Sequence, residues 1–200
     1  MTLDLVRTAY AARSAEYIAS VGSIDQVAKI DRDLTLAWAR GLHRGRCSTS
    51  AAGPGQWTDL LSAAGVDAEG VDPVPEFIDS VRASHPSDRY RVGRAEDLGV
   101  DDAALAGVLA RYSLIHTEPE LIDVPLAEFA RCVRSGGGLA LGFCAGARLE
   151  PFEHAVTTAY FWPIDQLAAR VEAAGFTVSR TATRAEPGTR PHGALLAVRR

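Results

Sequence analysis

Ala-Ala-Gly-Pro-Gly-Gln-Trp-Thr at residues 51–58, followed by Glu-Gly-Val-Asp at residues 69–72, is the stretch that decides the fold. A turn on Gly53 and Gly55 precedes a helical pattern, and Asp72 ends the next apolar run nineteen positions after Gly53. Glycines let a backbone approach a ligand closely, and a carboxylate at the end of a strand grips ribose hydroxyls. This layout predicts a nucleotide site.

Segments with helical and strand patterns alternate on both sides of the turn. Apolar spacing predicts helices over 4–20, 24–42, 57–64, 75–84, 121–133 and 164–174. Strands are expected over 66–71, 90–92, 106–110, 139–143, 176–183 and 194–199, and Gly136, Gly137 and Gly138 are expected to end the fifth helix. The alternation predicts an α/β fold, in which a mostly parallel sheet carries helices on both faces.

Composition and charge favour one domain with a small-molecule partner. The chain has 200 residues, 47% of them hydrophobic, and a net charge of −4 with scattered Lys and Arg, which argues against nucleic acid. No apolar run approaches membrane-spanning length, and residues 1–4 do not begin a secretion signal, so we expect a cytoplasmic protein without a membrane partner. Cys47, Cys132 and Cys144 are not spaced as metal ligands, so we expect buried free thiols and no metal site.

Five segments resemble, in order, the motifs of the small class I S-adenosylmethionine-dependent methyltransferases. They are the turn at 53–55, Gly70-Val71-Asp72, and residues 93–98, 111–116 and 133–139. Each is weak alone, but five in the correct order are specific. The resemblance covers nearly the whole chain. It implies a seven-stranded Rossmann-like sheet with an antiparallel last strand, in a single domain whose residues 1–43 form a helical lid over a core at 44–200.

The resemblance also implies an activity. The cofactor would be S-adenosylmethionine, the product S-adenosylhomocysteine, and the methyl acceptor an unidentified small molecule. His116 would be the catalytic base. The residues expected to contact the cofactor are Thr49, Ala51, Gly53, Gly55, Asp72, Pro73, Ala95, Glu96, Arg111, Tyr112 and Tyr10.

Several of these residues have a second interpretation that the sequence leaves open. Asp72 could serve only the turn before Pro73. His116 could be structural, and Tyr10 could pack in a core together with Tyr17. The aromatic segment at 160–163 either walls the acceptor cavity or anchors the helix that follows it.

The first motif departs from the family pattern at two positions. Members usually carry an acid followed by Gly-x-Gly before this helix, whereas Thr49 stands at the position of the acid and Ala51 at that of the first glycine. A Cβ at Ala51 would crowd a turn that needs positive φ, and Thr49 removes a charged acceptor. A central strand that reads Cys-Ser-Thr-Ser also has hydroxyls that need partners.

One hypothesis explains the altered segment at 46–52. A GC-rich coding of the usual Arg-Val-Leu-Asp-Val-Gly-Cys is CGG GTG CTC GAC GTC GGC TGC. Deletion of one G makes it read Arg-Cys-Ser-Thr-Ser-Ala-Ala, which is the sequence of this segment. A compensating base would restore the turn at 53–55. The segment would then result from a compensated frameshift, which is either real or a sequencing error. The alternative is a genuine strand that has diverged from the family sequence.

Two other function classes remain open. One is a non-catalytic binding protein of the methyltransferase fold, whose first motif is truly lost. The other is a nicotinamide-dependent oxidoreductase, against which the turn at 53–55 lacks the later glycine of the dinucleotide fingerprint.

Overall fold

The computed structural model describes residues 3–85 and 89–200, and it is built around a seven-stranded sheet in the order β3-β2-β1-β4-β5-β9-β8. The strands from β3 to β5 pair in parallel, whereas β9 runs antiparallel to both of its neighbours. The mostly parallel sheet with an antiparallel last strand is therefore confirmed. Its strands are β1 (Cys47–Ser50), β2 (Ala68–Asp72), β3 (Arg89–Val92), β4 (Leu105–Arg111), β5 (Val133–Cys144), β8 (Phe176–Arg184) and β9 (His192–Arg199).

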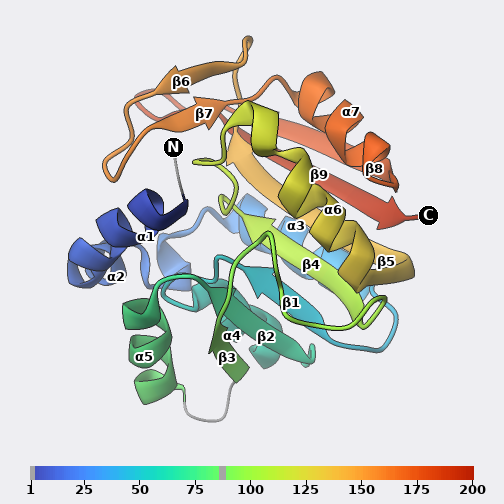
Figure 1. Ribbon diagram of the computed structural model, residues 1–200, viewed down its shortest axis with the longest axis horizontal. Coiled ribbons are helices and arrows are strands. Elements are labelled where there is room, and N and C mark those ends of the chain that lie inside the picture. The colour runs from blue at the N-terminus through green and yellow to red at the C-terminus, as the bar shows by residue number, and fades with distance from the viewer. Residues whose placement is uncertain (1–2, 86–88) are drawn as a thin grey trace.

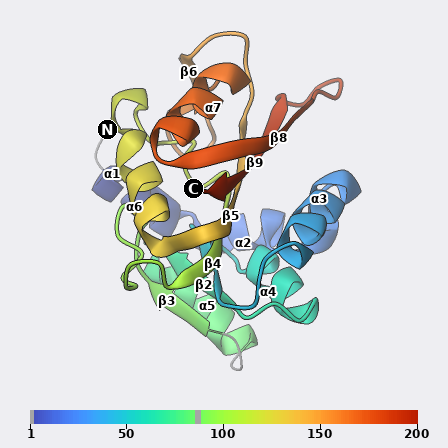
Figure 2. The ribbon, with the colours of Figure 1, turned by 90° about the vertical axis from the view of Figure 1, so that its right-hand side faces the viewer.

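Helices cover both faces of this sheet, as Figures 1 and 2 show. On one face lie α3 (Lys29–Arg40), α4 (Gln56–Ala63) and α5 (Pro75–Ser84), and on the other α6 (Asp123–Cys132) and α7 (Ile164–Ala173). At the amino end of the chain are α1 (Leu3–Ala12), α2 (Ser14–Val21) and the 3-10 turn η1 (Ile24–Gln26), while η2 (Pro119–Leu121) precedes α6. Every helix within the described residues is too short or too polar to cross a membrane.

The central strands are apolar because both of their faces are covered. Val108 of β4 packs in the cluster that contains α6 and α7, whereas its neighbour Leu109 packs against Trp38 and Trp57 on α3 and α4. Side chains alternate between the faces of a strand, so a strand between two helical layers reads as a continuous apolar run. This is why residues 106–110 were recognisable as a central strand.

The glycine run at 136–138 is part of β5 and does not end the preceding helix, which is a correction to the prediction. Gly138 pairs with Gly107 of β4. A Cβ at Gly138 would lie 2.6 Å from Leu42 Cδ2 and 2.7 Å from Trp38 Nε1. Gly138 therefore lets Trp38 of α3 and Leu42, which follows α3, approach the sheet closely.

The amino-terminal helices and one small sheet also differ from the prediction. The helix expected at 4–20 breaks at Arg13, whose guanidinium pairs with Glu16 and donates to the carbonyl oxygen of Ala155. The helix expected at 24–42 is split by an extended residue, Val27, between η1 and α3. The strands β6 (Glu150–Phe152) and β7 (Ala159–Phe161) form a separate antiparallel pair that was not predicted, because three-residue strands carry too little alternation.

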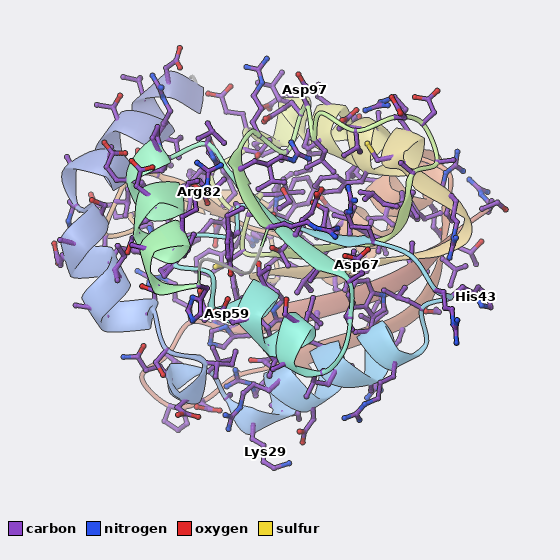
Figure 3. All side chains as sticks on the ribbon, turned by 90° about the horizontal axis from the view of Figure 1, so that it is seen from below. Lys29, His43, Asp59, Asp67, Arg82 and Asp97 are labelled. Atoms are coloured by element: carbon purple, nitrogen blue, oxygen red, sulfur yellow. The ribbon has the colours of Figure 1, made fainter. Side chains whose placement is uncertain are left out.

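The β3 edge of the sheet is held by side chains of α4 and α5. Figure 3 looks toward this edge, with Asp59 and Arg82 labelled on these two helices. Arg82 Nη2 donates to the backbone oxygen of Tyr90 at 2.7 Å, and the Tyr90 hydroxyl donates to Asp59 Oδ1 at 2.5 Å. Both contacts fix the strand that runs beside the end of β2.

Strand β1 is fully buried although all four of its residues are polar or small. The Thr49 hydroxyl bonds to that of Thr58 on α4 and donates to the Glu69 carbonyl at 3.1 Å. The hydroxyls of Ser48 and Ser50 are buried and have no hydrogen-bond partner in the described part of the chain. Ser48 pairs in register with Val108, in the apolar layer beneath α6 and α7. Burying an unpaired hydroxyl there destabilises the fold.

We predict that Ser48→Ala stabilises the protein, because it removes a buried hydroxyl without a partner. The free energy of unfolding should rise by about 1 kcal/mol. The matched variant Thr49→Val removes a hydroxyl that has two partners, so it should lower the same quantity by about 1 to 2 kcal/mol. Urea unfolding at neutral pH measures both, and equal destabilisation by the two variants would contradict the different hydrogen-bond status of these neighbours.

Candidate functional site

A cavity of about 1510 Å³ lies at the carboxyl ends of β1, β2 and β4. Residues of α1, α2 and the η1–α3 segment line it on one side, and the loop between β8 and β9 lines it on the other. Ligands of open α/β sheets bind beyond the carboxyl ends of the strands. Pockets for one small ligand are usually on the order of 300–1000 Å³, so this cavity has room for two.

The glycine turn after β1 adopts the left-handed conformation that its sequence predicts. Gly53 has φ 54° and Gly55 has φ 88°, and Ala51 has φ 49°. An L-residue with a side chain pays about 1–2 kcal/mol for this conformation. Ala51 therefore occupies a glycine position of the turn under strain, as its place in the altered motif predicts.

Asp72 joins this turn to the end of β2. Its Oδ2 accepts from the Gly53 amide at 2.8 Å, and its Oδ1 accepts from the Val74 amide at 2.8 Å. Burial raises the pKa of Asp72 to about 6, against the two backbone hydrogen bonds that lower it. The carboxylate lines the cavity, and each oxygen keeps a second lone pair for a ligand hydroxyl. The turn role and the ligand role of Asp72 are therefore compatible.

Several polar atoms along the cavity wall are buried without a partner in residues 3–85 and 89–200. They are Oε1 of Gln56, Oε2 of Glu96, Oγ of Ser113 and Nε of Arg111. Buried polar groups in proteins are nearly always hydrogen-bonded. These atoms indicate that the cavity wall offers hydrogen bonds to a polar ligand. Pro73 and Ala95 also line the cavity, next in sequence to the acidic residues Asp72 and Glu96.

His116 reaches the cavity from the segment after β4 and meets Tyr10 of α1. Nδ1 of His116 lies 2.7 Å from the Thr158 carbonyl oxygen, so it carries the proton and donates. Nε2 then accepts from the Tyr10 hydroxyl, 2.9 Å away. Burial lowers the pKa of His116, and burial also raises the pKa of Tyr10, so both groups are neutral at pH 7. The Nε2 lone pair therefore points to the hydroxyl of Tyr10, a residue of α1 that lines the cavity.

Arg111 and Tyr112 follow the carboxyl end of β4 and form the wall beyond His116. Nη2 of Arg111 pairs with Asp31 Oδ1 on α3 at 3.2 Å, and its guanidinium lies 5.1 Å from the ring centre of Trp57. Tyr112 has φ 60°, a strained value for a residue with a side chain. Its hydroxyl is hydrogen-bonded to His192 Nδ1 at 2.6 Å, and burial raises the pKa of Tyr112 to about 12.

Most of the predicted site residues line this one cavity, but two do not. The cavity wall includes Tyr10, Ala51, Gly53, Asp72, Pro73, Ala95, Glu96, Arg111, Tyr112 and His116. Thr49 lies behind the wall, where it bonds to α4. Gly55 begins α4, and a Cβ there would lie 2.7 Å from the Tyr90 hydroxyl and 2.8 Å from Val81 Cγ1. Thr49 and Gly55 are therefore placed to support the turn and not to face a ligand.

Other lining residues were not anticipated from the sequence. Trp57 lines the cavity, and so do Asp31, His154 and Arg190. The last three lie in segments that match no motif, so only the folded arrangement could reveal them. The aromatic segment at 160–163 takes the packing alternative, since Trp162 is buried in the core cluster that contains α7. Among the described residues, no group of three or more His, Cys, Asp and Glu side chains is arranged to hold a metal ion.

Comparison with known proteins shows which families this chain is similar to. Residues 49–141 match the family model described as a methyltransferase domain. Over this segment, somewhat under half of its length, the chain is similar to methyltransferase domains. Proteins called uncharacterized methyltransferases in Mycobacterium tuberculosis and Mycobacterium bovis are 36% identical to it over 90 residues. That match covers 45% of this chain and 36% of the relatives, so the chain aligns with about a third of their length.

Solved structures show the same fold over nearly the whole of this chain. The 1,6-didemethyltoxoflavin-N1-methyltransferase of Burkholderia thailandensis, solved with its substrate and S-adenosylhomocysteine, has a TM-score of 0.79 and 16% identity and covers 98% of this chain and 88% of its own. The magnesium protoporphyrin IX methyltransferase of Synechocystis PCC 6803, solved with S-adenosylhomocysteine, has a TM-score of 0.78 and 18% identity and covers all of both chains.

We predict that His116 is a neutral imidazole with its proton on Nδ1 at pH 7, because Nδ1 faces a carbonyl oxygen. Nitrogen-15 NMR of the histidine side chains measures the tautomer and the pKa, which should lie below the ordinary value. In Tyr10→Phe, the Nε2 resonance should shift while the Nδ1–H tautomer is kept. A proton on Nε2, or an imidazolium at pH 7, would contradict the described hydrogen bonds.

Proposed function

We propose that this methyltransferase domain transfers a methyl group from S-adenosylmethionine to a small-molecule acceptor. The observation that carries the proposal is the carboxylate of Asp72. It is buried beside the Gly53 turn, its two oxygens are held by backbone amides, and it opens onto a cavity large enough for two ligands. This arrangement suits the ribose of a nucleoside cofactor and leaves space for an acceptor.

The residues around Asp72 fit the rest of such a cofactor. The unpaired Oε2 of Glu96, beside Ala95, suits the exocyclic amine of adenine. The turn at 51–53 brings backbone close to the ligand, and Tyr10 and Tyr112 flank the end where the methionine part would lie. Residues 1–43 would act as a lid, since α1 reaches His116 through Tyr10 and α3 reaches Arg111 through Asp31.

Methyl transfer requires the protein to position the two reactants and to provide one proton acceptor. The sulfonium of the cofactor supplies an activated methyl group. The domain must align the acceptor atom with it and exclude water. An acceptor hydroxyl or amine would give its proton to the Tyr10 hydroxyl oxygen, which would pass its own proton to the Nε2 lone pair of His116. The resulting imidazolium would keep its Nδ1–H bond to the Thr158 carbonyl.

The non-catalytic alternative is favoured by the contacts of Thr49. At the place of the family's acid, its hydroxyl is used by Thr58 and the Glu69 carbonyl, so it offers no charge to the cavity. In that case the domain would bind a nucleoside ligand without transferring a methyl group. Binding and transfer therefore have to be measured separately.

We predict that the affinity for S-adenosylhomocysteine rises with pH as Asp72 ionises. Ribose hydroxyls donate to the carboxylate, so protonation of Asp72 competes with binding, and a pKa of about 6 places the change between pH 5 and 7. Binding should be about tenfold weaker at pH 5 than at pH 7. Calorimetric titration measures it. Asp72→Asn should bind more weakly at pH 7 and show little pH dependence, and a wild-type profile in this variant would contradict the role of Asp72.

Transfer is tested with S-adenosylmethionine that carries a labelled methyl group, incubated with a small-molecule extract. Label in a new compound with wild-type protein, and not with Asp72→Asn, is the expected result. Binding of S-adenosylhomocysteine without label in any fraction would favour the non-catalytic alternative. Absence of binding would overturn the proposal as a whole.

A further inference from the structure

Three arginines stand in the part of the cavity wall made by the ends of β4 and β8 and the start of β9. Arg111 and Arg184 share one partner, Asp31, at 3.2 Å and 2.8 Å, and Arg184 also pairs with Glu186. Their charges are therefore neutralised within the protein. The third, Arg190, precedes β9 and lines the same cavity.

Arg190 has no carboxylate within ion-pair distance among the residues that the structure describes. Its guanidinium lies 4.8 Å from the ring centre of Phe152, and its Nη2 donates to the Glu153 carbonyl at 3.1 Å. These contacts hold the side chain against the β6–β7 pair, but one carbonyl satisfies only part of the donor set of a guanidinium. The group is exposed at the cavity opening with its charge uncompensated.

Arg190 is connected to His116, the proposed base, through two intervening aromatic side chains. His154 lies between them in a chain of contacts: its ring centre is 5.1 Å from that of His116 and 6.4 Å from that of Phe152, on which Arg190 sits. Burial, the nearby His116 and then the Arg190 charge lower the pKa of His154 to about 4, so this ring adds no charge of its own at pH 7. The same Arg190 charge opposes the effect of burial on the pKa of Cys144.

We infer that Arg190 binds an anionic group of the methyl acceptor, a carboxylate, while the accepting hydroxyl or amine faces His116. The inference rests on the proposed function and names its substrate class, a small carboxylic acid. A planar guanidinium with free donors matches a carboxylate in two parallel hydrogen bonds. A cavity wall with one uncompensated cation also concentrates anions near the site.

The competing occupant of Arg190 is the carboxylate of the cofactor itself. The two occupants are distinguished by measuring, on the same proteins, the affinity for S-adenosylhomocysteine and the affinity for carboxylic acids. S-adenosylhomocysteine is titrated first, and carboxylic acids are then titrated against the complex in pairs with their primary amides: benzoate, indole-3-acetate and octanoate. The variants are Arg190→Gln, Arg190→Lys and the control Arg180→Gln, which changes an exposed arginine of β8 away from the cavity.

We expect at least one acid to bind the wild-type complex more tightly than its amide. Arg190→Gln should weaken that acid about tenfold and leave the amide and S-adenosylhomocysteine unchanged, whereas Arg190→Lys should retain most of the affinity. Arg180→Gln should behave as wild type. The inference is overturned if no acid outcompetes its amide, if Arg180→Gln causes the same loss, or if Arg190→Gln weakens S-adenosylhomocysteine instead. In the last case Arg190 serves the cofactor and the proposed function stands.

Discussion

The carboxylate of Asp72 connects two segments that the strands alone would leave independent. One oxygen holds the amide of Gly53 in the turn after β1, and the other holds the amide of Val74 ahead of α5. A charge-assisted bond to a backbone amide in a buried place is stronger than a neutral one. Because the turn, the end of β2 and the start of α5 meet at this side chain, the floor of the cavity depends on it.

A second set of contacts joins the amino-terminal helices to the same cavity. Asp31 binds arginines from β4 and β8, Tyr10 reaches His116, and Arg13 reaches the β6–β7 connection through Ala155. The apolar contacts differ among these helices: α3 packs in the core through Trp38, whereas α2 has no buried residue and meets α5 through the rings of Tyr17 and Phe77. Polar contacts of this kind break locally at lower free energy than a packed core opens. The proposed lid motion is therefore expected of α1 and α2 and not of α3, which is anchored in the core.

The sequence predicts those parts of the structure that are determined by residues close together in the chain. Helix α5 has the bounds expected from its pattern and Pro75, and the positive φ of Ala51 follows from the glycine position it occupies. The run at Gly138 was misassigned because its reason is the close approach of Trp38, a contact more than ninety residues away in the chain. His154 and Arg190 were missed for the same reason, since no neighbouring residue marks them.

The residues of strand β1 are poorly suited to the buried position that the fold gives them. Ser48 and Ser50 occupy places where the layer around them is apolar, and Ala51 is strained at the first position of the turn. The usual family sequence would place Leu, Val and Gly at these three positions, as the frameshift hypothesis requires. We propose that the cavity still binds the cofactor with the residues it has, because Asp72 still holds the amide of Gly53.

A calorimetric titration of the wild-type chain with S-adenosylhomocysteine, beside the variant Ala51→Gly, tests this binding. We predict saturable one-to-one binding by both proteins at pH 7, with the variant tighter by up to about tenfold because its turn is unstrained. Binding by the variant alone, with a wild-type protein that is folded by circular dichroism, would contradict it.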